Sequence, residues 1–121
     1  MATVQTPRRS SRVFIRIRVY AQGRDRDGRR FRELSETIVV NAHGALIYLN
    51  QTMAIDTMIM LVNPVTEEEQ ECRVVYLGEA TVKGQRIGVE FLCPSPRFWG
   101  LEFPPGDWVP LTSPAAPVPP N

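Results

Sequence analysis

Hydrophobic and polar residues alternate along the first stretch of the chain that can form regular structure. The odd-numbered positions are apolar: Val13, Ile15, Ile17 and Val19. The even-numbered positions are mixed and include basic residues: Phe14, Arg16, Arg18 and Tyr20. Successive side chains of a strand point to opposite faces, so this period of two predicts a half-buried strand from Val13.

A turn signal follows this strand directly. The segment 23–30 reads GRDRDGRR and contains Asp27-Gly28, a dipeptide typical of hairpin turns. Residues 31–40, FRELSETIVV, then resume a strand-like pattern. The sequence therefore predicts that the first two strands form a hairpin.

Four more strands are expected further along the chain. A tight loop at 41–44 precedes ALIYL at 45–49, and an apolar run at 57–62 ends at Asn63-Pro64. Residues 71–78 and 86–91 supply the last two, with turn chemistry at Gly78 and Gly84. Residues 50–56 are too short to assign as a helix. Six short strands favour an all-β antiparallel barrel over a sandwich, because closure removes exposed strand edges.

The two ends of the sequence lack this periodicity. Residues 1–12 are polar and basic, contain Pro7, and predict a flexible Arg-rich arm. Residues 13–108 form the expected barrel domain with a short capping segment after its last strand, and the Pro-rich residues 109–121 predict a disordered tail.

Composition limits the size and the partners of the protein. With 121 residues and 43% hydrophobic residues, the chain suits one domain with a modest core. Its net charge is only +1, so DNA binding by overall charge is not expected. Arginine is nevertheless concentrated before position 33, and glutamate is concentrated at 67–71. An anion site is therefore expected to be local and to involve the first quarter of the chain.

Residues suited to metal binding or catalysis are sparse. The chain has one histidine and two cysteines without CxxC spacing, so no metal or other cofactor is expected, and both cysteines read as small buried hydrophobes. No set of nucleophile, base and orienting group is apparent, and an enzyme is not expected. No apolar run approaches the ~20 residues of a membrane span, which leaves the cytoplasm as the expected compartment.

The first candidate binding motif is the pair Arg8 and Arg12 in an RxxxR spacing, with Arg9 beside it. Guanidinium groups donate paired hydrogen bonds to phosphate or to the O6 and N7 atoms of guanine. Four extended residues span about 13–14 Å, so two arginines can contact different parts of one dinucleotide. The alternative is a solvated basic arm without a ligand.

The second candidate is the loop of Asn41, Ala42, His43 and Gly44. Gly44 permits a ligand to approach the backbone, and Asn41 offers both donors and acceptors. His43 suits either a phosphate or base contact or a role in capping the loop. An ordinary tight turn closed by an Asx hydrogen bond is the alternative.

Aromatic residues are dense after the last expected strand. Phe98, Trp99 and Trp108 are expected to plug the barrel mouth or pack on its outer face, because aromatic rings bury the largest area per residue. An exposed protein-docking patch is the alternative.

Together the RxxxR arm, the loop VVNAHGALI and the strand IGVEF resemble the PilZ family over about residues 8–108. That resemblance implies a six-stranded barrel that binds cyclic di-GMP through the arm arginines and a motif Asp/Asn-x-Ser-x-x-Gly. Arg8 and Arg12 match the first motif and Gly44 matches the last position of the second. Val39 then stands at the Asp/Asn position and Asn41 at the serine. Starting the motif at Asn41 instead places His43 at the serine and Leu46 at the glycine.

The resemblance implies a receptor that holds cyclic di-GMP with Arg8, Arg12, Asn41, His43 and Gly44, with Arg9 as an auxiliary contact, and that signals to a downstream protein. A second hypothesis is a degenerate PilZ domain that binds no nucleotide and works as a protein-interaction module. Its main support is the missing acid at position 39.

Overall fold

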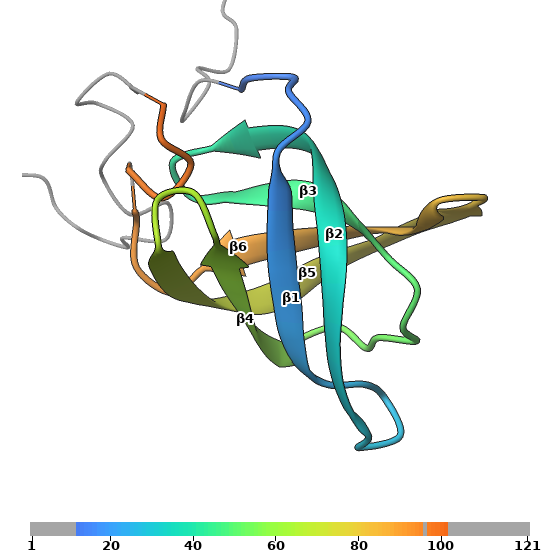
Figure 1. The fold of residues 1–121 in the computed structure, drawn as a ribbon. Coiled ribbons are helices and arrows are strands. Elements are labelled where there is room, and N and C mark those ends of the chain that lie inside the picture. Colours follow the sequence, from blue (N-terminus) through green and yellow to red (C-terminus); the bar gives the residue numbers. More distant parts are fainter. Residues whose placement is uncertain (1–11, 96, 102–121) are drawn as a thin grey trace, which may run out of the picture.

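Six antiparallel strands close into a barrel (Figure 1). The structure, a computed structural model, describes residues 12–95 and 97–101. The strands are β1 Arg18–Arg24, β2 Arg30–Asn41, β3 Gly44–Leu49, β4 Met58–Asn63, β5 Glu68–Thr81 and β6 Gly84–Phe91. Around the barrel the order is β1, β2, β3, β6, β5, β4, and β4 pairs again with β1. The predicted all-β barrel is confirmed, and the closure leaves no unpaired edge strand among these six.

The parity expected for the first strand is confirmed, but its start is not. Val13, Ile15 and Ile17 are half-buried while the residues between them are exposed, as the alternation predicts. The regular strand β1 nevertheless begins only at Arg18. Before it, the side chain of Thr37 replaces part of the ladder: its hydroxyl accepts from the Ile17 amide at 2.9 Å and donates to the Ile15 carbonyl at 2.6 Å.

The hairpin of β1 and β2 is present, with a wider loop than the Asp-Gly signal suggests. Arg24 pairs with Arg30, which leaves residues 25–29 in the loop. The Asp25 carboxylate accepts from the amides of Asp27 and Arg29, each at 2.9 Å, and Gly28 has a φ of 82°. Gly28 thus provides the left-handed conformation, while the side chain of Asp25 closes the loop.

One expectation holds and one is corrected further along the chain. Residues 50–56, which the sequence did not assign as a helix, connect β3 to β4 as an irregular loop. Gly78 lies inside β5 and not at a turn, between Leu77 and Ala80, where the register with β6 shifts. A Cβ at Gly78 would lie 2.7 Å from the Tyr76 ring, so the glycine permits a close side-chain approach.

The core fills the barrel interior and continues into the segment after β6. Phe98 and Trp99 are buried and form edge-to-face or stacked contacts with Phe91. The indole Nε1 of Trp99 donates to the Asn41 carbonyl at 2.9 Å. These two rings therefore pack against one end of the barrel, as expected, and they fix the turn at which β2 ends. Trp108 lies outside the described residues.

Candidate functional site

One groove on the barrel surface contains most of the described candidate residues. It is open, has a volume of about 340 Å³, and Arg12, Asn41, His43 and Gly44 line it. Arg12 comes from the segment before β1, whereas the other three form the turn between β2 and β3. The fold thus brings the second arginine of the RxxxR motif beside the predicted loop. Arg8 and Arg9 lie outside the described residues. We call this the arm groove.

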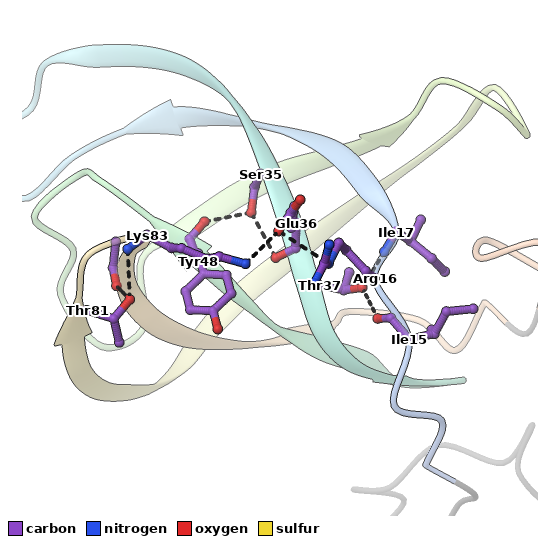
Figure 2. Close-up of polar contacts among 10 residues, drawn as sticks. Ile15, Arg16, Ile17, Ser35, Glu36, Thr37, Tyr48, Thr81 and Lys83 are labelled. Carbon is purple, nitrogen blue, oxygen red and sulfur yellow. Dashed lines mark hydrogen bonds and ion pairs between the residues drawn. The ribbon is translucent and has the colours of Figure 1, made fainter.

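The position of Arg12 depends on how the preceding segment is attached to β2. Val13 and Val40 exchange two main-chain hydrogen bonds of 2.9 Å. Further along, Thr37 holds both Ile15 and Ile17 through its buried hydroxyl, as Figure 2 shows. Glu36 adds a peripheral ion pair with Arg16 at 3.7 Å, and the exposure of Arg16 makes this contact weak. Residues 13–17, which we call the base of the arm, are therefore attached to β2 mainly by main-chain and Thr37 hydrogen bonds.

The turn itself is closed by Asn41. Its Oδ1 accepts from the His43 amide at 2.8 Å, which is the local Asx bond expected of an ordinary tight turn. The His43 carbonyl accepts from the Phe91 amide at 2.7 Å and ties the turn to the end of β6. The His43 side chain is only 4% exposed, so it offers little surface to a ligand in this conformation.

Gly44 is required by close packing. A Cβ at this position would lie 2.0 Å from the Val89 carbonyl oxygen, a main-chain atom of β6 that cannot move aside easily. Gly44 also pairs directly with Glu90 of β6. The glycine therefore allows β3 and β6 to approach at the floor of the groove.

Sequence reasoning missed two residues of the arm groove. Phe14 lines it with a side chain that is 79% exposed, and Glu90 lines it with a carboxylate that accepts from Arg73 at 3.0 Å. Phe14 could have been noted as an aromatic on the solvent parity beside Arg12. No local signal marks Glu90, because only the pairing of β3 with β6 brings it to the turn.

The groove combines three kinds of chemistry. Arg12 is a cation with hydrogen-bond donors, Glu90 is an acceptor, and the remaining walls are largely apolar, including Val39 and Leu46. Val39 is half-buried there, so the position at which the PilZ motif has an acid is an apolar part of the wall. This arrangement suits a flat ligand that carries anionic groups and N–H donors.

Comparisons with known proteins add no assignment: no family model matches the sequence, and no curated protein matches it. Within the described ranges, no group of three or more His, Cys, Asp or Glu side chains is placed to hold a metal ion. The same part of the chain contains no helix with the length and apolar character needed to cross a membrane. Burial raises the pKa of the Cys72 thiol, which lies in the core as expected. Cys93 is exposed, so the expectation that both cysteines are buried is wrong for this residue.

Proposed function

We propose that the protein is a cyclic di-GMP receptor of the PilZ type that holds the nucleotide in the arm groove. The observation that carries the proposal is the meeting of Arg12 and the 41–44 turn in one groove on the outside of a six-stranded barrel. These segments are far apart in the sequence, and both contain candidate binding residues that the sequence predicts.

Each described wall of the groove has a role in this proposal. Arg12 pairs with a phosphate or with the O6 and N7 atoms of a guanine. Phe14 presents an exposed ring on which a base stacks. Glu90 accepts from guanine N–H groups. The PilZ motif gives this role to an Asp or Asn, which Val39 cannot replace. Arg8, and secondarily Arg9, are expected to add contacts from the arm.

Calorimetric titration with cyclic di-GMP tests the proposal, with GTP and cyclic GMP as controls. Arg12→Ala and Arg8→Ala should each weaken binding by about 1.5–3 kcal/mol, the range for hydrogen bonds to charged groups. Arg26→Ala is the matched control, because Arg26 is exposed on the β1–β2 loop and does not line the groove. Full affinity in both arginine variants would exclude this site, and no heat from the wild-type protein would exclude the function.

Val39→Asp tests the alignment of the second motif. The new carboxylate would add an acceptor for guanine N–H groups and should raise the affinity. Because Val39 is half-buried, the variant should also lose some stability. A folded Val39→Asp protein that binds no better would favour the alignment that starts at Asn41.

A second function is favoured by the apolar character of the groove. Phe14, Val39 and Val75 line it, and an exposed apolar groove with an aromatic residue is also typical of a protein-docking surface. In this case the chain is a PilZ-like interaction module without nucleotide affinity. Phe14→Ala would then abolish partner binding, while cyclic di-GMP would give no signal at any concentration tested.

A further inference from the structure

A second and larger groove lies beside the β1–β2 hairpin, away from the arm groove. It has a volume of about 620 Å³, and its walls include Arg24, Arg30 and Arg32 on one side and Met58 and Met60 of β4 beside them. We call it the hairpin groove. Neither the PilZ resemblance nor the proposed nucleotide site involves it.

The arginines of this hairpin carry charges that no described acidic residue neutralises. All five between positions 24 and 32 are exposed, and none forms an ion pair with another described residue. Arg24 and Arg30 even stand directly opposite each other on β1 and β2, although like charges at such positions destabilise a hairpin. An anionic partner at this position would offset the repulsion between them.

Two of these side chains are already held in place by neutral groups. The Arg32 guanidinium lies 3.9 Å from the centre of the Tyr20 ring, and its Nε donates to Gln22 at 3.1 Å. Arg24 donates to the Gly28 carbonyl at 2.8 Å. These contacts already restrict the two side chains, so less conformational entropy is lost when their remaining N–H donors bind an anion.

A segment whose charge is complementary to that of the hairpin arginines follows the other end of β4. The turn from β4 to β5 carries Glu67, Glu68 and Glu69, all exposed and none in an ion pair among described residues, and Val65, which is 85% exposed. It is rigidly built, because Asn63 Oδ1 accepts from the Val65 amide at 2.9 Å and the Glu67 amide donates to the Asn63 carbonyl at 2.7 Å. We call residues 64–69 the acidic turn.

The acidic turn does not line the hairpin groove of its own barrel. The groove residues Met58 and Met60 lie about 10–17 Å along β4 from Asn63, after which the turn begins. Figure 1 shows the β1–β2 loop and the β4–β5 loop at opposite ends of the barrel. The two features are therefore separate surfaces of one barrel and can meet between different copies.

We propose that the acidic turn of one copy docks in the hairpin groove of a second copy, so that the protein associates head to tail. Glu67, Glu68 and Glu69 face the arginines, while Val65 covers Met58 and Met60. Glu71 on the opposite wall of the groove repels the glutamates and so directs them toward the arginine side. Because the contact joins two different surfaces, it propagates from copy to copy and does not stop at a dimer unless a ring closes.

A uniformly anionic partner fits this face less well than a second copy. A nucleic-acid backbone or a membrane lying across the groove would meet Glu71 of β5 as well as the arginines. A compact acidic turn meets only the basic wall. The charge pattern therefore favours a protein segment, and the chain carries one of suitable composition.

Sedimentation of the full chain without nucleotide tests the proposal. The average mass should rise above the 13.7 kDa of the monomer with protein concentration at about 0.1 M salt and return toward it at about 1 M salt, where the screening length falls from ~10 Å to ~3 Å. Arg30→Glu/Arg32→Glu and Glu68→Arg/Glu69→Arg should each weaken association at least about tenfold. Lys83→Glu/Arg86→Glu is the control for the arginine variant, since it makes the same charge change as Arg30→Glu/Arg32→Glu but lies away from both surfaces.

The mixture of the two charge-reversed variants gives the decisive measurement. Each variant alone brings like charges together, but in the mixture each reversed groove meets a reversed turn and each unchanged groove meets an unchanged turn. Association should therefore return in the mixture. A wild-type chain that stays monomeric at low salt, a control that associates as weakly as the reversed variants, or a mixture that stays monomeric would each overturn the proposal. None of these results depends on nucleotide binding.

Discussion

Replacing Thr37 by valine removes the hydroxyl that attaches the base of the arm to β2. Two hydrogen bonds are lost, from the Ile17 amide at 2.9 Å and to the Ile15 carbonyl at 2.6 Å. At about 0.5–1.5 kcal/mol each, they stabilise the fold by about 1–3 kcal/mol. Thr37 is only 3% exposed, so the added methyl group of valine recovers at most about 0.8 kcal/mol. With the full recovery the net loss is about 0.2–2 kcal/mol, and it is larger if the Ile17 amide and the Ile15 carbonyl are left without any hydrogen-bond partner.

Urea unfolding measures this loss, and the slope should stay constant if only stability changes. Thr37→Ser is the matched control, because it keeps the hydroxyl and removes only a methyl group. Amide exchange separates the two variants: the Ile17 amide should exchange faster in Thr37→Val than in Thr37→Ser. If both variants protect this amide equally, the hydroxyl does not hold the arm and the reasoning fails.

The same pair of variants tests the link between the arm and the proposed ligand. If Arg12 must be held beside the 41–44 turn to bind cyclic di-GMP, Thr37→Val should weaken the affinity while Thr37→Ser retains it. Equal affinities in a protein that does bind the nucleotide would show that the arm orders independently of β2.

Three further predictions concern the turn and the core. Gly44→Ala should destabilise the protein by about 3 kcal/mol or more, measured by urea unfolding, because its Cβ meets the Val89 carbonyl at 2.0 Å; a loss below about 1 kcal/mol would contradict this packing. Trp99→Phe keeps a ring but removes the hydrogen bond to Asn41, so it should cost about 0.5–1.5 kcal/mol, and an unchanged unfolding midpoint would show that the bond contributes nothing. The raised pKa of Cys72 keeps its thiol neutral in the fold, so its contribution is complete below the unfolded pKa of about 9.0 and falls by about 1.4 kcal/mol per pH unit above it. The difference in unfolding free energy between wild type and Cys72→Val should therefore shrink as the pH rises, whereas that between wild type and Cys93→Ser serves as the reference for an exposed cysteine.

Much of the fold can be predicted from the sequence because strand periodicity and turn chemistry are local. The alternation from Val13 identified which side chains face the core, and Asn41 to Gly44 were correctly expected to form a tight turn. Local signals also misled: Gly78 has the composition of a turn residue, yet it lies inside β5, where the Tyr76 ring packs against it. A glycine permits a turn and a close approach equally, and only its neighbours in space decide between them.

The sites depend on pairings between distant strands. Closure of β4 onto β1 creates the hairpin groove, and pairing of β3 with β6 brings Glu90 beside Gly44. The alternation of side chains along a strand is independent of which strand lies next to it, so it cannot specify such neighbours. The sequence by itself therefore determined the strands, their inward faces and the candidate residues Arg12, Asn41 and Gly44. The tertiary structure decided that these share one groove and that His43 is buried, because contacts across the barrel follow from the register and closure of the sheet.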